Sequence, residues 1–144
     1  MRLFLDSNVI LSGLLSSKGA PRIILDLLSI EVPILNGLTG QYNLDEIERN
    51  LGHRFPNLLP IWKDYMPRMR LEIIEIPTYE EIRSLLGKMP PTDAPVLASA
   101  RKGAADYLIS GDKRAFPKQL VSPIRLVPPS DFLDKILPGL ILTE

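Results

Sequence analysis

Short apolar runs alternate with helical segments along the whole chain, and this alternation constrains the fold more than any other feature. The runs are apolar at nearly every position, which is typical of strands buried on both faces of a parallel sheet. Strands that alternate with helices predict an α/β protein, a three-layer α/β/α sandwich with a mostly parallel central sheet. The predicted strands cover 2–5, 32–35, 71–76, 105–110 and 124–127.

Capping and helix-breaking residues mark the helices between these strands. Asp6 or Ser7 can cap a helix that follows the first strand. Thr92 can cap a later helix, which Gly103 would end. The predicted helices cover 8–16, 23–30 with Pro21 in the first turn, 41–51, 56–67, 79–88, 93–102 and a final segment from Asp131.

The length and composition of the chain fit one domain. At 144 residues, 45% of them hydrophobic, the chain can bury a substantial core. No internal repeat or low-complexity linker divides it. We therefore expect a single domain over 1–144, in which 128–144 form a C-terminal helix and an apolar tail that packs on the body or on a partner.

The charge balance and the missing cysteines exclude several classes of protein. Since 17 basic residues balance 17 acidic ones, RNA binding would need a local basic patch or a bound cation. The absence of cysteine excludes disulfides, thiolate zinc sites and cysteine nucleophiles. No apolar stretch reaches the roughly 18 residues of a membrane helix. Asp6 and Asn8 interrupt the apolar N-terminus where a signal peptide needs its centre, so we expect a cytoplasmic protein with no membrane association.

Acidic residues follow the predicted strands at positions where they can meet. Ligands of open parallel sheets bind beyond the carboxyl ends of the strands. Asp6 ends the first strand and Asp112 follows the strand at 105–110, so the two carboxylates meet if these strands are neighbours. Asp93 opens a helix near the same edge, and the helix at 41–51 adds further acids. Four acidic positions are therefore expected to converge.

Converging carboxylates predict a cation and a particular chemistry. Close carboxylates repel one another unless a cation lies between them. Oxygen ligands, with no cysteine and one histidine in the chain, suit Mg²⁺ or Mn²⁺ rather than zinc. Such an ion orients a water molecule, lowers its pKa and offsets charge on a phosphoryl group. The pattern therefore predicts phosphodiester hydrolysis or, more broadly, phosphoryl transfer.

Each acid, taken alone, also has an ordinary structural explanation. Asp6 can be a simple helix cap, and Asp93 can be a first-turn acid on the helix dipole. Asp112 can be the turn residue of Gly-Asp-Lys, and a glutamate on a helix is usually a solvated surface charge. The hypothesis of a site therefore depends on the combination.

Three segments, in order along the chain, resemble the PIN-domain family. LFLDSNVILSGLLSSKGAP resembles the opening of the family, where an apolar strand delivers the first aspartate. LDEIERNL resembles the middle helix that carries an acid, and PPTDAPVLASARKGAADYLISGDKRAF resembles the second half of the family. With the α/β pattern between them, the resemblance covers roughly residues 1–127.

The resemblance implies a metal-dependent endoribonuclease that hydrolyses RNA phosphodiester bonds and binds Mg²⁺ or Mn²⁺ through a carboxylate cluster. Many single-domain members are toxins of toxin–antitoxin pairs. The expected partners are therefore single-stranded RNA, a small antitoxin protein and a second copy of the chain. Carried over by position, the implied catalytic and metal-binding acids are Asp6, Glu46, Asp93 and Asp112, with Asn8 and Ser110 as supporting polar residues.

Two departures leave parts of this site open. Some members have a further acid shortly after the last aspartate, where this chain has Ala115, and this puts a second metal ion in doubt. The helical wheel of 41–51 does not distinguish Glu46 from Asp45 or Glu48, and only alignment with the family favours Glu46.

Other residues permit two interpretations. Lys113 and Arg114, directly after Asp112, can contact phosphate or can be solvated turn charges. Trp62 and Tyr65 can stack an RNA base, but their helical spacing favours a core or dimer contact.

Two other functions compete with a nuclease. A haloacid-dehalogenase-like phosphatase also has an aspartate after its first strand, but it needs a second one where this chain has Asn8. A non-catalytic PIN-like module for protein or RNA binding is the other alternative, and the presence of all four acids argues against it.

Overall fold

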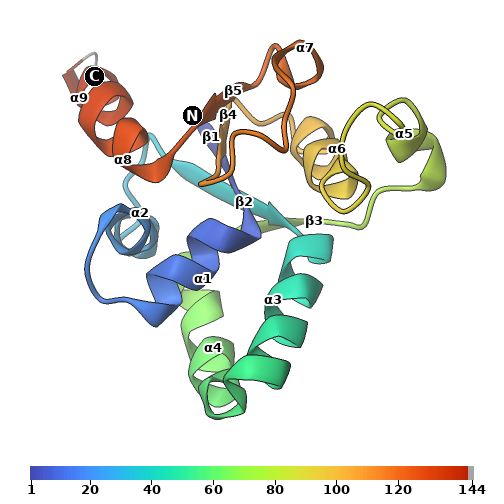
Figure 1. The fold of residues 1–144 in the computed structure, drawn as a ribbon. Coiled ribbons are helices and arrows are strands. Elements are labelled where there is room, and N and C mark those ends of the chain that lie inside the picture. The colour runs from blue at the N-terminus through green and yellow to red at the C-terminus, as the bar shows by residue number, and fades with distance from the viewer. Residues whose placement is uncertain (143–144) are drawn as a thin grey trace.

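Five parallel strands form the central sheet of the computed structural model, which describes residues 1–142 (Figure 1). Their order across the sheet is β3-β2-β1-β4-β5, so the first strand lies in the middle. The predicted parallel sheet is confirmed, and the expected neighbours β1 and β4 pair in register from Leu3 with Tyr107 onwards. The strands are β1 Arg2–Leu5, β2 Asn36–Gly40, β3 Glu72–Ile74, β4 Tyr107–Ile109 and β5 Arg125–Val127.

Helices cover both faces of the sheet and give the predicted three layers. One buried cluster joins the sheet to α1–α4 and the C-terminal helices, and the other joins it to α5–α7. The helices are α1 Ser7–Leu15, α2 Ala20–Ser29, α3 Gln41–Arg54, α4 Leu59–Tyr65, α5 Tyr79–Arg83, α6 Ala94–Lys102, α7 Lys118–Val121, α8 Pro129–Asp131 and α9 Leu137–Leu142, with 3₁₀ turns at Pro56–Leu58 and Met66–Met69 and a π-helical segment Phe132–Ile136.

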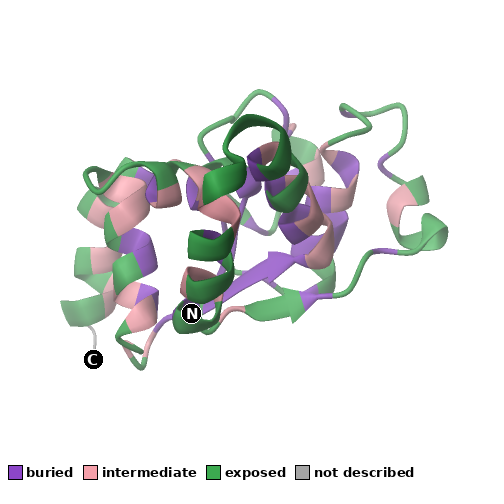
Figure 2. Ribbon diagram, turned by 90° about the horizontal axis from the view of Figure 1, so that it is seen from below, coloured by how far each residue is buried: buried purple, intermediate pink, exposed green. Residues whose placement is uncertain are grey.

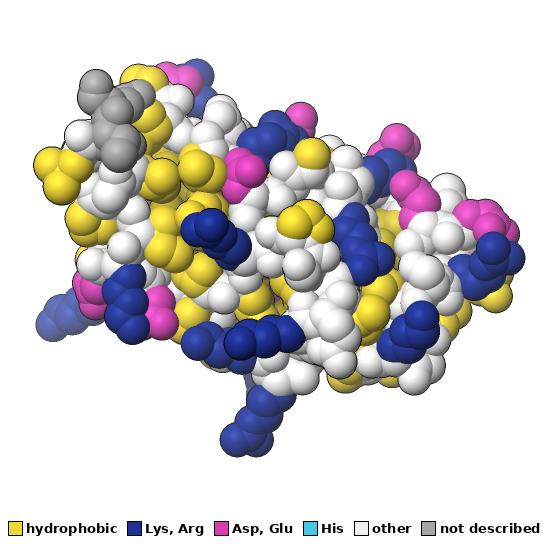
Figure 3. Space-filling view, turned by 90° about the horizontal axis from the view of Figure 1, so that it is seen from above, with side chains coloured by type: hydrophobic (Ala, Val, Ile, Leu, Met, Phe, Trp, Pro, Cys, Tyr) yellow, Lys and Arg dark blue, Asp and Glu magenta, His cyan; other side chains and the backbone are white. Residues whose placement is uncertain are grey.

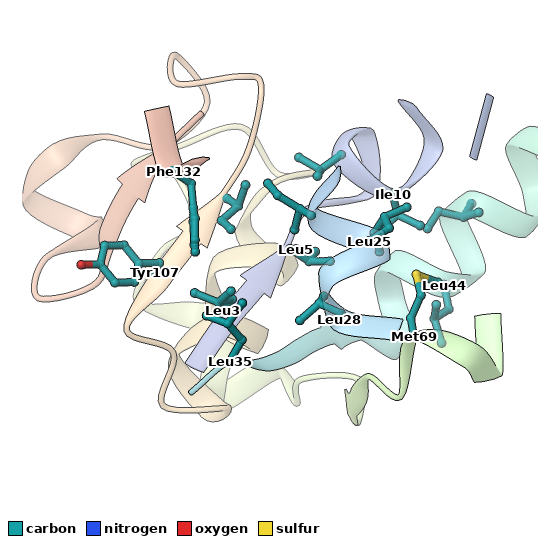
Figure 4. Close-up of a cluster of buried hydrophobic side chains, with 14 of the residues drawn as sticks. Leu3, Leu5, Ile10, Leu25, Leu28, Leu35, Leu44, Met69, Tyr107 and Phe132 are labelled. Atoms are coloured by element: carbon teal, nitrogen blue, oxygen red, sulfur yellow. The ribbon is translucent and has the colours of Figure 1, made fainter. Parts of the chain in front are cut away.

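The central strand β1 separates the two halves of the core. Leu3 and Leu5 point into the cluster with α1 and α2, while Phe4 points into the cluster with α6, and all three are fully buried. This follows from the two-residue period of a strand. Figure 2 shows an inner strand of the sheet as buried, whereas the edge strand β3 is largely exposed. Figure 4 shows the first cluster, in which Leu25 and Leu28 of α2 lie beside Leu3 and Leu5.

The prediction of a strand at 32–35 was wrong. This apolar segment forms a turn, in which the Leu35 amide donates to the Val32 carbonyl over 3.0 Å, and β2 begins only at Asn36. The sequence of β2, NGLTG, carries few apolar side chains because its neighbours fill the space. A Cβ atom at Gly37 would lie 2.8 Å from Leu28 and 2.7 Å from Leu71.

Two helix predictions also differ from the structure. The helix predicted over 79–88 is α5 and ends at Arg83, after which the chain turns through Gly87 at a φ of 81°. Thr92 does not cap α6; the cap position is Asp93, which makes no capping hydrogen bond through its side chain. Asp6 caps α1 as predicted, and Gly103 ends α6.

The C-terminal segment packs on the body of the domain along one side. Leu133, Ile136 and Leu137 lie against the first core cluster, and Leu142 remains 84% exposed. The predicted tail also included 143–144, which lie outside the described residues. Over 1–142, no helix is both long enough and apolar enough to span a membrane.

Candidate active site

Asp6 lies at the carboxyl edge of the sheet, directly after the central strand. Its side chain is only 6% exposed, and the Ser7 amide donates to its Oδ1 atom over 2.8 Å. The Ser110 hydroxyl, at the end of β4, donates to its Oδ2 atom over 2.7 Å. The neighbouring strands β1 and β4 therefore hold this carboxylate in a fixed place.

Ser110 and Asn8 connect Asp6 to the loop that carries Asp112. The Asp112 amide donates to the Ser110 Oγ atom over 3.1 Å, and the Gly111 amide donates to Asn8 Oδ1 over 3.1 Å. Asn8 Nδ2 in turn lies 3.3 Å from Asp6 Oδ2. The structure thus brings Asp6, Asn8 and Ser110 into one hydrogen-bonded group and places the exposed Asp112 at its edge.

Asn43 belongs to the same group and was missed in the sequence. It is completely buried, and its Nδ2 atom donates to Ser7 Oγ over 2.9 Å and lies 3.5 Å from Asp6 Oδ1. Because α3 follows β2 without a loop, Asn43 fixes this helix against Asp6. Its position four residues before Ile47, on the apolar face of α3, was the signal that a buried amide was present.

Electrostatic coupling links Asp6 to the other predicted acids. The pKa of Asp6 is raised to about 6, chiefly by burial and in smaller part by the charges of Glu46 and Asp93. Burial also raises the pKa of Asp93, with the charges of Asp112 and Glu46 as the next causes. The neighbouring acids therefore disfavour the charged forms of Asp6 and Asp93.

The structure separates Glu46 from its acidic neighbours on α3. Asp45 Oδ1 accepts a hydrogen bond from Gln41 Nε2 over 2.9 Å, and Asp45 and Glu48 line a surface hollow together with Lys63 of α4. The charge of Glu46 contributes to the raised pKa of both Asp6 and Asp93, and neither Asp45 nor Glu48 is among the causes. Among the three acids that the helical wheel left open, Glu46 is the one whose charge raises the pKa of Asp6 and of Asp93.

The chemistry of these side chains fits a hard divalent cation. Carboxylate and amide oxygens are the ligands that Mg²⁺ and Mn²⁺ accept, and the buried Asn43 Oδ1 has no hydrogen-bond partner within 1–142. In that same range, no three acidic or histidine side chains are close enough to hold an ion as they stand. Mg²⁺ usually keeps several of its waters, so a site of this openness suits it.

Two further features adjoin the acids. Lys113 and Arg114 follow Asp112 and are exposed, and the Arg114 amide donates to Asp112 Oδ1 over 3.1 Å. A hollow of about 570 Å³ adjoins Asn8 and Asp112 and extends to Pro21 at the start of α2. Of the four acids, Asp112 is the one that lines this hollow.

The raised pKa of Asp6 gives a prediction for the metal-free protein. Because the folded protein binds this proton more tightly than the unfolded chain, the stabilisation is complete below pH of about 4 and is lost as the pH rises through about 6. A difference of this size corresponds to about 3 kcal/mol in the free energy of unfolding. Urea unfolding between pH 4 and 8 measures it. Asp6→Asn is expected to flatten this part of the profile, and an equal slope in both proteins would contradict the assignment.

Fold and site together define an α/β domain with an acidic site at the carboxyl edge of a parallel sheet. The chain belongs to the PIN domain family, since the model of that domain matches residues 2–114. PIN domains are generally nucleases, and they typically use divalent metals. No curated protein sequence matches the chain.

A solved structure shares the fold. It is a crystal structure of VapBC2 from Rickettsia felis bound to a DNA fragment from their promoter, and one of its chains matches with a TM-score of 0.60 and 17% sequence identity. The match covers 88% of this chain and 97% of that one. At this identity the likeness confirms the three-layer PIN-like fold.

Proposed function

We propose that the protein is a metal-dependent endoribonuclease that hydrolyses phosphodiester bonds of single-stranded RNA. The observation that carries the proposal is the electrostatic coupling of Asp6, Glu46 and Asp93 at one edge of the sheet. The match of residues 2–114 to the PIN domain supports it.

Asp6, Glu46, Asp93 and Asp112 would hold one Mg²⁺ or Mn²⁺ ion, or two. A divalent ion at this place supplies a water of lowered pKa and offsets negative charge on the phosphate. Ser110 and Asn8 keep the Asp6 carboxylate oriented through the hydrogen bonds described above. Lys113 and Arg114 would contact phosphate oxygens beside the bond that is cut.

Cleavage of a mixed single-stranded RNA by the purified protein tests the proposal. We expect cutting in Mn²⁺ or Mg²⁺ and none in EDTA. A folded protein that cuts no RNA in either metal would favour the second candidate, a non-catalytic PIN-like binding module. The observation that favours this second candidate is that, within residues 1–142, no three acidic side chains are close enough together to hold an ion. Membership of the PIN domain family leaves no support for the haloacid-dehalogenase-like phosphatase.

The middle acid can be tested directly. We expect Glu46→Gln to lower the cleavage rate about a hundredfold or more, because one of the charges that hold the cation is lost. Asp45→Asn is the matched control. It removes the same charge from the neighbouring residue of α3, whose carboxylate accepts a hydrogen bond from Gln41. Initial cleavage rates at saturating Mn²⁺ are measured for both variants. Equal losses of rate would contradict the assignment of Glu46 as the middle acid of the site.

The proposed partners follow from the family. The structurally similar VapBC2 is an antitoxin–toxin complex. By analogy, a small antitoxin protein would bind and inhibit this chain. A homodimer and a cytoplasmic location also remain predictions. Light scattering of the purified protein, alone and with the product of an adjacent small gene, tests the oligomeric state and the antitoxin.

A further inference from the structure

A second hollow begins beside the carboxyl edge and leads away from it. It has a volume of about 880 Å³ and lies between the loop after β4, helix α7 and the outer strand β5. We call it the α7 groove. It is lined by Lys113, Arg114, Phe116, Pro117, Lys118, Gln119, Val121, Ser122, Ile124, Arg125 and Leu126.

The charge of the α7 groove has one sign. Four lining residues are cations, namely Lys113, Arg114, Lys118 and Arg125, and none is acidic. All four are exposed, and none forms an ion pair with a carboxylate within the described part of the chain. The Arg125 guanidinium lies 6.0 Å from the centroid of the Tyr107 ring, and its Nη1 atom donates to the Tyr107 hydroxyl over 3.5 Å. Unpaired cations in a shared hollow attract an anion more strongly than cations that a carboxylate already neutralises.

The sequence concentrates these charges in a chain that is otherwise balanced. Between Asp112 and Asp131 there is no acidic residue, although the whole protein has 17 acidic and 17 basic residues. Figure 3 views the molecule from the side of α7, and in its lower middle several Lys and Arg side chains appear with no acidic side chain among them. The local basic patch that RNA binding requires in a neutral protein is therefore present.

The floor of the α7 groove is apolar. Phe116, Val121 and Ile124 are almost completely buried beneath it, while the side chains of Gln119 and Ser122 are exposed at its surface. A single nucleic-acid strand presents phosphates along one side and the flat faces of its bases along the other. Because the apolar side chains lie beneath the surface, they shape the α7 groove, and the exposed cations along it are the groups that the phosphates of a strand would meet.

The α7 groove begins next to the acidic site and runs from there along the side of the sheet. Lys113 follows Asp112 at the carboxyl edge, whereas Arg125 begins β5 and pairs with Tyr107 at the opposite edge of the sheet. We propose that the α7 groove binds the single-stranded RNA on one side of the phosphate that is cut. This inference rests on the proposed function, and it assigns Lys118 and Arg125 to the substrate.

Binding of a fluorescent, unstructured RNA of 20 nucleotides tests this proposal by anisotropy. Asp6→Asn in every protein keeps the RNA intact, and Lys118→Gln with Arg125→Gln removes two groove charges. We expect a dissociation constant about tenfold weaker, and a salt dependence of the logarithm of the affinity that is shallower by about 1.4, since each lost phosphate contact removes about 0.7.

The control variant removes the same charge elsewhere. Arg54 and Lys63 are exposed at the end of α3 and on α4, far from α7 in Figure 1, and neither forms an ion pair in residues 1–142. Arg54→Gln with Lys63→Gln should bind RNA like the parent. Equal binding by the groove variant, or equal losses in both variants, would overturn the proposal.

Failure of the groove and failure of the nuclease proposal give different results. RNA cleavage by the protein with Asp6 intact is measured separately in Mn²⁺. If cleavage occurs and the groove variant binds RNA normally, RNA binding in the α7 groove is contradicted and the nuclease proposal is supported. If no cleavage occurs but binding depends on Lys118 and Arg125, the groove stands and the protein is an RNA-binding module.

Discussion

Replacing Asp6 by asparagine is expected to reduce RNA cleavage by about a thousandfold and to leave the fold intact. The loss is large because Asp6 is the buried acid around which the others are arranged, and its charge is what a cation would bind. The fold should survive because asparagine caps helices as well as aspartate does. Single-turnover cleavage in Mn²⁺ and thermal unfolding measure the two effects.

The control for this variant is Asp26→Asn, which removes a carboxylate paired with Arg22 on α2, outside the proposed site. It should cut RNA like the parent protein. Cleavage by Asp6→Asn at the parental rate would mean that the acids do not form the active site or that another nuclease contaminates the preparation. A lowered unfolding temperature with partial activity would instead assign Asp6 a purely structural role.

Truncating Trp62 to alanine is expected to destabilise the protein by about 3–5 kcal/mol. Trp62 is 1% exposed, and it lies in the core cluster that also contains Ile47 and Leu51 of α3. The surrounding side chains cannot refill a space of that size. In a domain of this length the loss corresponds to an unfolding temperature lower by about 10 °C, which calorimetry measures.

The same variant decides between the two interpretations of Trp62. A residue that stacked an RNA base would lose RNA affinity at unchanged stability. Burial predicts the reverse, a less stable protein whose folded fraction binds RNA normally. Trp62→Phe keeps most of the buried area and should lose less than half as much stability. The half-buried Tyr65 lies under the Arg22 guanidinium at 5.2 Å, so both aromatic residues have structural partners.

The strands that could be predicted are those whose own side chains fill the core. β4 is apolar at every position and β1 at every position after Arg2, and these apolar residues are buried on both faces, so the location of both strands follows from the sequence. β2 could not be predicted because Leu28 and Leu71 occupy the space that its side chains would need. The apolar segment before it, at 32–35, was the stronger local signal.

The site was predictable where strand ends determine it. Asp6 and Ser110 follow strands that pair with each other, so their meeting could be expected from the fold alone. The choice of Glu46 over Asp45 and Glu48 stays a prediction, because the helical wheel leaves the direction of each side chain on α3 open. Asn43 was missed because a lone amide beside apolar positions resembles an ordinary polar residue until its burial is known.

The two outer strands of the sheet also determine whether copies of the protein aggregate through their sheet edges at high concentration. β3 and β5 have three residues each, and both carry a charge, Glu72 bound by Arg2 on one side and Arg125 on the other. Pro123 and Pro128 flank β5 and have no amide to offer a neighbouring strand. Short, charged edges of this kind are poor templates for another copy of the chain, and the domain thereby protects itself against edge-to-edge aggregation.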